Sequence, residues 1–247
     1  MSDKKGKKLK LKLIKKRFLL NYPQKIILYP IIRKIFPYTM LSYTAICEMY
    51  DYIKEVSDKE IEGDIVEMGC WNGGCGAFMA WCVNKVNFSK TIWLFDSFEG
   101  LPELSHEDSE WADKQKQLKI KDDKSSEIKS TGFMVANEAN VREALKKMGA
   151  EKNVHVVKGW FQESIPEVKH RIQKISILRL DGDLYESTLY CLEELYDMVV
   201  VGGYVVIDDY HLEGCRRALY EFFYKRNINP LIINNQFGGR SYFRKNK

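Results

Sequence analysis

Short apolar runs rich in β-branched residues alternate with helical segments along most of the chain, and this alternation constrains the fold more than any other feature. The runs are GDIVEMG (63–69), KTIWLFDS (90–97), NVHVVKGW (153–160), KISILRLDGD (174–183) and GGYVVIDDY (202–210). The segments between them have the apolar spacing of amphipathic helices. Strands that alternate with helices form a parallel sheet covered by helices on both faces, so we expect an α/β fold.

The predicted helices cover residues 43–56, 76–86, 134–149, 188–200 and 214–226. Two further apolar runs, NPLIINN (229–235) and RSYFRK (240–245), are joined only by QFGG. This connection is too short for a parallel crossover, so the two runs predict an antiparallel hairpin. Five parallel strands followed by such a hairpin are the outline of the Rossmann-like class I methyltransferase fold, with a seven-stranded, mostly parallel sheet. A nicotinamide dehydrogenase more often continues with a sixth parallel strand.

Positive charge is concentrated at the N-terminal end. Residues 1–35 hold 12 of the 39 Lys and Arg residues and one of the 34 acidic residues, so they carry +11, whereas the rest carries −6. We therefore predict a basic arm over 1–35, a helical lid over 36–60 and an α/β domain over 61–247. The arm is either a solvated tail or a segment that lies on an anionic membrane, where each Lys contributes roughly 1 kcal/mol. The acidic body offers no basic groove for nucleic acid.

Cysteine use and hydropathy favour a cytoplasmic protein. The six cysteines form no CxxC pair and have no histidine nearby at zinc-ligand spacing, so we expect reduced core thiols rather than disulfides. The most apolar early stretch (18–36) is interrupted by Lys25, Arg33 and two prolines, and a membrane span needs about 20 apolar residues. The expected location is the cytoplasm, or the inner membrane face if the arm docks there.

In an open α/β sheet, ligands bind beyond the carboxyl ends of the strands, so the residues at these ends are the candidate site. They are Glu67, Gly69, Asp96, Ser97, Gly159, Trp160, Asp181, Asp183, Asp208, Asp209 and His211. His211 stays open between a substrate contact and an ordinary polar rim. The acidic residues dominate this set, and they fall into two groups with different expected roles.

The first group indicates a nucleoside cofactor. VEMGCWNGGCG (66–76) is a glycine-rich turn whose spacing fits G-x-x-x-G rather than G-x-G-x-x-G, and a plain strand–helix turn is the alternative. Asp96 ends the next predicted strand, where an acid accepts hydrogen bonds from ribose hydroxyls. Glu67 beside the turn would repel a pyrophosphate and suits a cationic cofactor such as S-adenosylmethionine.

The second group, Asp181, Asp183, Asp208 and Asp209, follows two consecutive strands. Uncompensated like charges raise pKa values and cost stability, so four crowded aspartates predict a bound cation. An all-oxygen set suits Mg²⁺, with Ca²⁺ and Mn²⁺ as alternatives. The competing interpretation is helix capping by Asp183 and Asp209, which explains one acid at each strand end but not two.

Taken together, these motifs resemble the macrocin O-methyltransferase family, metal-dependent S-adenosylmethionine enzymes that methylate sugar hydroxyls on antibiotics. The stretches that carry the resemblance are GDIVEMGCWNGG, DSFEGLPE, GWFQESIP, LRLDGDLYEST, GGYVVIDDY and GCRRAL, over roughly residues 60–220. The resemblance implies metal ligands at Asp181, Asp208 and Asp209, and a general base at Asp183. It implies cofactor contacts at Glu67, Gly69, Asp96 and Ser97, with Gly159 and Trp160 near the adenine.

The resemblance also implies a mobile lid, for which PYTMLSYT (37–44) is the candidate. The chain departs from the family at Asn72, where arginine is usual, in residues 1–35, and in the lysine-rich insertion 104–130. We expect an O-methyltransferase that depends on S-adenosylmethionine and Mg²⁺ and acts on a sugar hydroxyl. The carbohydrate acceptor is expected in a surface polysaccharide, its activated precursor or a glycosylated natural product. Alternatives are a catechol-type enzyme and a non-catalytic, membrane-docked adaptor, and residues 26–50 are a candidate homodimer contact.

Overall fold

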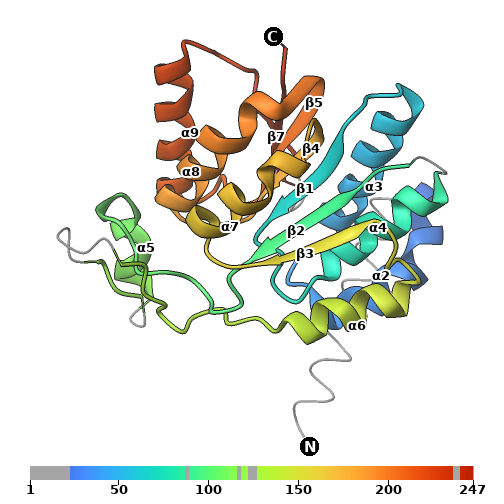
Figure 1. The fold of residues 1–247 in the computed structure, drawn as a ribbon, viewed down its shortest axis with the longest axis horizontal. Helices are drawn as coiled ribbons and strands as arrows, with labels where there is room; N and C mark the ends of the chain where they lie inside the picture. Colours follow the sequence, from blue (N-terminus) through green and yellow to red (C-terminus); the bar gives the residue numbers. More distant parts are fainter. Residues whose placement is uncertain (1–22, 87–88, 116–117, 122–126, 236–239, 247) are drawn as a thin grey trace, which may run out of the picture.

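The computed structural model describes residues 23–86, 89–115, 118–121, 127–235 and 240–246. One seven-stranded sheet in the order β3-β2-β1-β4-β5-β7-β6 runs through the molecule (Figure 1). The first five strands are parallel, and β7 is antiparallel to both β5 and β6. The predicted α/β fold with a C-terminal antiparallel hairpin is therefore confirmed. The strands are β1 (Asp64–Met68), β2 (Ile92–Asp96), β3 (Val154–Lys158), β4 (Ile175–Leu180), β5 (Val199–Ile207), β6 (Ile233–Asn234) and β7 (Ser241–Arg244).

Helices cover both faces of the sheet, and two apolar cores result (Figure 1). One core lies under α2 (Tyr29–Ile35), α3 (Tyr43–Asp58), α4 (Gly74–Lys85) and α6 (Glu138–Met148). The other lies under α7 (Phe161–Val168), α8 (Tyr185–Leu195) and α9 (Glu213–Arg226). Every residue of β4 is buried, as expected for a central parallel strand covered on both sides. The described residues include no helix long and apolar enough to cross a membrane.

The described part of the predicted arm and lid is packed into the domain. Residues 23–38 form a 3₁₀ turn (Pro23–Leu28), α2 and a second 3₁₀ turn (Phe36–Tyr38), and Ile32 and Ile35 are fully buried. Helix α3 is capped by Ser42, whose hydroxyl accepts the N–H of Ala45 at 3.1 Å, and most of the residues of the helix are buried. The packing therefore shows no break at residues 35 or 60, and the basic residues 1–22 lie outside the described residues.

Three predicted elements differ at their ends for local reasons. Helix α6 begins at Glu138 rather than at Met134, because the side chain of Asn137 accepts the N–H of Ala139 and caps the helix there. Helix α8 ends at Leu195, and the apolar residues that follow enter β5 from Val199. The predicted strand over 229–235 forms ladder pairs only at Ile233 and Asn234.

The described residues of the insertion after β2 form no strand of the sheet. It contains a 3₁₀ turn (His106–Asp108) and the short helix α5 (Ser109–Lys114), and two isolated bridges close it on itself. It has a small apolar cluster of its own, formed by Leu104, Leu118 and Leu184. All six cysteines of the chain are buried free thiols.

Strand order reverses between β1 and β4, which are neighbours in the sheet, and the loops after them lie against each other. Gly69 has φ +88°, and a Cβ there would lie 2.0 Å from the backbone oxygen of Asp181. The two loops carry the cofactor turn and the aspartates, so this contact sets how closely the two halves of the site approach. Only glycine permits the contact.

We expect Gly69→Ala to lower the free energy of unfolding by more than about 2 kcal/mol, because it adds a backbone clash to the cost of a positive φ. Gly132→Ala is the matched control, since Gly132 also has a positive φ (+69°) but nothing within 4 Å of a Cβ. The control substitution should lower the free energy of unfolding by about 1 kcal/mol. Urea unfolding measures both, and equal losses would show that the loop contact does not constrain the fold.

Candidate active site

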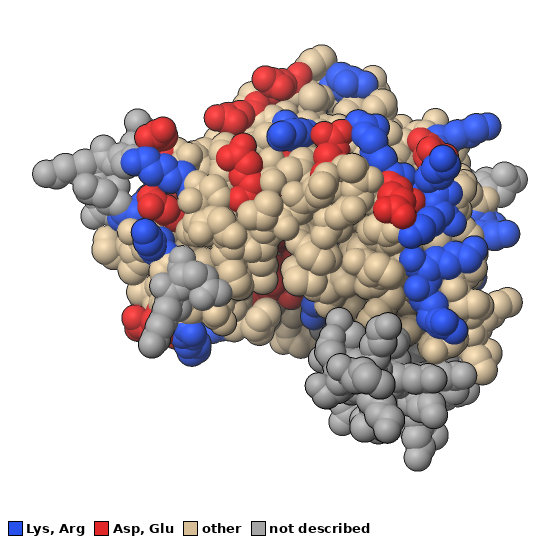
Figure 2. Space-filling model, turned by 90° about the horizontal axis from the view of Figure 1, so that it is seen from below, with Lys and Arg blue, Asp and Glu red and all other residues tan. Residues whose placement is uncertain are grey.

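A cavity of about 300 Å³ opens at the carboxyl ends of the parallel strands. Figure 2 shows acidic atoms recessed in a hollow of the molecular surface. The cavity wall includes nine of the ten residues to which the sequence assigned a role: Gly69, Asp96, Ser97, Gly159, Trp160, Asp181, Asp183, Asp208 and Asp209. His211 also lines it, so it is placed at the site rather than on a remote rim. The tenth residue, Glu67, is not part of the wall.

One end of the cavity is built from the loops after β1, β2 and β3. Both carboxylate oxygens of Asp96 accept backbone N–H groups: Oδ2 from Trp71 at 2.7 Å and Oδ1 from Phe98 at 2.8 Å. Burial raises the pKa of Asp96, and these hydrogen bonds oppose the rise. The acid is thus fixed at the end of β2, where its remaining lone pairs can accept hydroxyl hydrogen bonds.

Two residues of this end stabilise the loops themselves. Asn72 is buried, and its Oδ1 accepts the N–H of Asn137 at 3.0 Å and the Nδ2–H of Asn140 at 2.9 Å. It therefore ties the glycine turn to the N-terminus of α6, which accounts for the residue that departs from the family pattern. The hydroxyl of Ser97 donates to the carbonyl of Gly100 at 3.1 Å and so closes the turn after β2.

Glu67 does not have the role assigned from sequence. Its side chain is fully buried, and its Oε1 accepts from Nη1 of Arg179 at 2.8 Å. A Cβ at Gly76 would lie 3.0 Å from its Oε2, so this carboxylate points toward α4 and away from the cavity. The prediction that Glu67 contacts the cofactor is therefore not supported by its position. Its carboxylate instead pairs with the buried guanidinium of Arg179.

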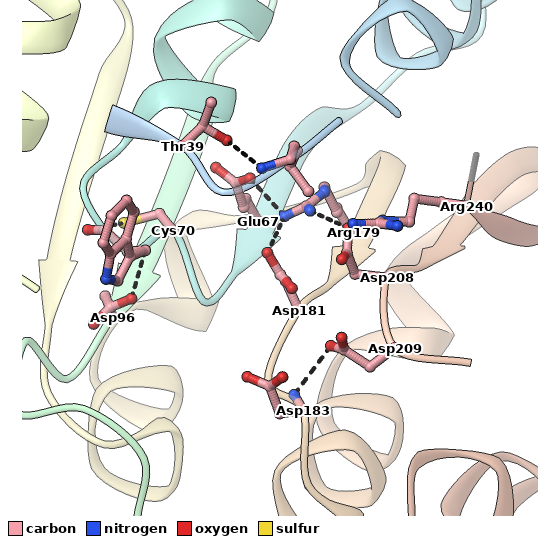
Figure 3. Close-up of polar contacts among 12 residues, drawn as sticks. Thr39, Glu67, Cys70, Asp96, Arg179, Asp181, Asp183, Asp208, Asp209 and Arg240 are labelled. Carbon is pink, nitrogen blue, oxygen red and sulfur yellow. Dashed lines mark hydrogen bonds and ion pairs between the residues drawn. The ribbon is translucent and has the colours of Figure 1, made fainter. Parts of the chain in front are cut away.

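Arg179 lies under the aspartates and joins them. It is 1 % exposed, and its Nη1 also donates to Oδ2 of Asp181 at 2.7 Å, while its Nη2 donates to Oδ1 of Asp208 (Figure 3). Burial works to lower the pKa of Arg179, but the carboxylates around it raise that pKa well above its usual value. Arg240 approaches Asp208 from the segment before β7, with Nε 2.7 Å from Oδ1.

The acids outnumber these two guanidinium groups. Glu67, Asp181, Asp183, Asp208 and Asp209 bring five carboxylates to one buried region. Burial, followed by repulsion from neighbouring carboxylates, raises the pKa of Asp183 and of Asp209 well above the usual value. For Asp181, burial raises the pKa to about 7 even though the Arg179 guanidinium opposes the rise. The region is short of positive charge.

The carboxylates fit a divalent cation. One oxygen from each of Asp181, Asp208 and Asp209 can be chosen so that the three lie within 4.8 Å of one another. Arg179 takes one oxygen of Asp181 and one of Asp208, and within the described chain the second oxygen of each carboxylate accepts no other hydrogen bond. Carboxylate oxygens with this spacing suit a hard cation.

Asp183 occupies a strained turn. Its φ is +60°, and the N–H of Leu184 donates to the carbonyl of Gly182 at 2.6 Å, which closes a three-residue turn. The N–H of Asp183 donates to Oδ2 of Asp209 at 3.2 Å (Figure 3). Gly182 has no positive φ, so the left-handed backbone conformation occurs at Asp183 and not at the glycine. Such a conformation costs about 1–3 kcal/mol and is typical of functional sites.

The capping interpretation of Asp183 and Asp209 is wrong. Helix α8 has its N-cap at Leu184 and helix α9 at Leu212, and neither helix has a side-chain cap from these positions. Both carboxylates face the cavity instead. The first N–H of α8 is satisfied by Asp108, an acid from the insertion that the sequence patterns did not single out.

Other residues of the site that sequence reasoning missed include Trp71, Trp111, Arg179 and Arg240. A signal for Arg179 was present, because a lone charged residue inside the apolar run ISILRL must be paired when it is buried. Arg240 and Trp71 have no such signal, since their positions depend on loop conformation. Trp111 belongs to the insertion, and it lines the cavity beside His211 and Leu212.

Comparisons with known proteins agree with this geometry. Residues 33–245 match the model of the family described as macrocin O-methyltransferase (TylF). One relative is a tetracenomycin 4'-O-methyltransferase of Streptomyces olivaceus, named for its 2,3-dimethoxy-α-L-rhamnosyl substrate. The two chains are 30% identical over 187 residues, which cover 75% of this chain and 67% of the relative. A second relative is demethyldecarbamoylnovobiocin O-methyltransferase of Streptomyces niveus. It is 30% identical to this chain over 199 residues, which cover 79% of this chain and 71% of the relative.

Solved structures show the same relationship. The O-methyltransferase NovP superposes with a TM-score of 0.72 at 27% identity, covering 85% of this chain and 83% of NovP. The calicheamicin methyltransferase CalS11 superposes with a TM-score of 0.65 at 18% identity, over 84% of this chain and 80% of CalS11, and shares the fold. Family match, sequence relatives and fold therefore coincide. The chain belongs to the macrocin O-methyltransferase family and is an S-adenosylmethionine-dependent O-methyltransferase.

Proposed function

We propose that this enzyme methylates a hydroxyl group of a sugar with the help of a divalent cation, Mg²⁺ by default. Asp181, Asp208 and Asp209 would hold the cation, and Asp183 would act as general base. The observation that carries the proposal is the placement of a strained Asp183 on the same cavity wall as a cluster of carboxylates that outnumbers its guanidinium partners. Residues that only stabilise a fold have no need of this arrangement.

The cavity has two chemically different ends. Asp96, Ser97, Gly159 and Trp160 line the end where a nucleoside would bind, and the aspartates line the other. Bound S-adenosylmethionine supplies a sulfonium methyl as the electrophile, and a bound divalent cation lowers the pKa of a coordinated hydroxyl. The protein's part is to bring the acceptor oxygen to within about 3–3.5 Å of the methyl carbon.

Asp183 removes the proton from the acceptor hydroxyl. An unactivated sugar hydroxyl is a poor nucleophile, so the transfer needs a carboxylate within hydrogen-bond reach of its proton. The hydroxyl oxygen forms a bond to the methyl carbon, the carbon–sulfur bond breaks, and the proton moves to Asp183.

A sugar acceptor is supported by the names of the relatives, which methylate sugar-bearing antibiotics. We place the sugar in a surface glycan or in its nucleotide- or lipid-linked precursor, because residues 1–35 carry +11 and would favour an anionic surface. A glycosylated natural product is the second candidate. A catechol is a further candidate, since two adjacent hydroxyls on an aromatic ring can also bind a divalent cation.

Asp183→Asn should lower kcat by about 10²–10⁴-fold, because it removes the general base but keeps the size of the side chain. The Kd for S-adenosylmethionine should stay within twofold, since Asp183 lies at the far end of the cavity from Asp96. Calorimetry and single-turnover methyl transfer measure the two quantities. Activity within tenfold of the wild type would exclude Asp183 as the base.

Mg²⁺ should stabilise the protein even without an acceptor. At 100 times its Kd, the ion adds about 2.7 kcal/mol and raises Tm by roughly 5–10 °C. Asp209→Asn should abolish this shift, yet it should not lower Tm in EDTA, because it removes one of the crowded negative charges. Asp197→Asn, at an exposed surface ion pair, is the control and should keep the shift. An unchanged Tm for the wild type on adding Mg²⁺ would contradict the cation site.

A panel of acceptors separates the substrate classes. It should contain a nucleotide-linked deoxysugar, a lipid-linked oligosaccharide, a demethylated aminocoumarin glycoside and a catechol, each tested with Mg²⁺ and with EDTA. We expect methyl transfer to a sugar, detected by mass spectrometry as a gain of one methyl group and lost in EDTA. Transfer to the catechol alone would overturn the sugar assignment, and full activity in EDTA would overturn the metal assignment.

A further inference from the structure

We propose that Asp108, in the insertion between β2 and α6, is a positioning residue that fixes the turn of Asp183. This inference rests on the proposed role of Asp183 as general base. It gives the insertion a function that nothing in the sequence patterns indicated. The insertion holds the start of α8, directly after the catalytic turn.

The Asp108 carboxylate is buried, with 3 % of the residue exposed, although it belongs to a polar insertion. The backbone N–H of Tyr185 donates to its Oδ1 at 3.0 Å and to its Oδ2 at 3.3 Å, and the hydroxyl of Ser105 donates to Oδ2 at 3.0 Å. Tyr185 is the first residue of α8, two residues after Asp183. The acid therefore caps this helix from another part of the chain.

The chain around Gly214 leaves room for this carboxylate. A Cβ at Gly214, the second residue of α9, would lie 1.8 Å from Oδ1 of Asp108. The carboxylate thus lies between the first turns of α8 and α9, the two helices that follow the metal-binding loops. Any larger side chain at Gly214 would displace it.

Two more contacts join the insertion to the start of α8. The side chain of Leu184 is buried against Leu104 and Leu118, with Trp111 and Phe133 packed around them. Lys121 forms an ion pair with Glu186 at 2.5 Å. The residue before Tyr185 and the residue after it are therefore both held by the insertion.

The turn of Asp183 is fixed from two sides. On one side, Asp209 accepts the N–H of Asp183 at 3.2 Å. On the other, Asp108 accepts the N–H of Tyr185, and the insertion buries Leu184. A positive φ at Asp183 persists only where the surroundings impose it, so loss of the second attachment should allow the turn to relax. A displacement of about 1 Å at a reacting group can cost 10²-fold in rate.

The first test needs no acceptor. Asp108→Ala should raise the amide exchange rate of residues 183–187 about tenfold or more, measured by mass spectrometry on the full chain with Mg²⁺ present. Asp108→Asn keeps an acceptor for the N–H of Tyr185 and should restore most of the protection. Asp113→Ala, at an exposed acid of the short helix α5 in the same insertion, is the control. Unchanged exchange in Asp108→Ala would overturn the proposal.

The second test measures turnover with the acceptor that the panel identifies. Asp108→Ala should lower kcat about 10–100-fold. Its Kd for S-adenosylmethionine and the Tm shift with Mg²⁺ should not change, and Asp108→Asn should recover most of the loss. In an Asp183→Asn background, Asp108→Ala should cause less than about a twofold further loss, because both changes act on one step.

The outcomes separate the two proposals. If Asp183→Asn is inactive while Asp108→Ala turns over normally, the role of Asp108 is wrong and the role of Asp183 stands. If Asp108→Ala lowers kcat in the Asp183→Asn background as much as it does in the wild type, Asp108 acts independently of Asp183. This result would overturn the positioning role. Full activity of Asp183→Asn would overturn the proposed function, and the role of Asp108 with it.

Discussion

The buried guanidinium of Arg179 is the interaction on which the site depends. A single charge near the carboxyl end of β4 contacts carboxylates from β1, from its own strand end and from the end of β5, and so joins three neighbouring strands. A buried charge is tolerated only when it is paired, and breaking such a pair by removing one partner costs about 3–5 kcal/mol. The fold and the site are therefore not separable at this position, because the residue that organises the aspartates also compensates Glu67 inside the core.

The aspartates themselves divide by environment. Asp181 and Asp208 share the Arg179 guanidinium, whereas Asp183 and Asp209 have no such partner and are linked through a backbone N–H. Burial and neighbouring carboxylates raise the pKa of Asp183 and of Asp209 well above the usual value, whereas the Arg179 guanidinium opposes the rise at Asp181. The aspartates of one cavity thus lie in different electrostatic environments.

Most of the fold and the carboxylates of the cavity wall could be predicted from sequence, and the exceptions have physical causes. The strands were evident because buried parallel strands are continuous apolar runs, and the aspartates because strand ends meet at one edge of the sheet. Glu67 was predicted to contact the cofactor, but the structure points it toward α4, where it pairs with Arg179. Asp108 and Arg240 were missed because loop conformation and long-range docking bring them to the site.

The order in which the site residues occur along the chain has a consequence for biosynthesis. Strands β1 to β5 can pair as they leave the ribosome, and Arg179 then meets its carboxylates within the nascent sheet. Arg240, whose N–H donates to Glu48 of α3 at 2.8 Å and whose Nε faces Asp208, emerges only after α9. A nascent chain halted after β5 would expose an overly acidic cavity whose second compensating guanidinium has yet to be synthesised. Early capture of a cation by such an intermediate would stabilise it until β7 joins the sheet.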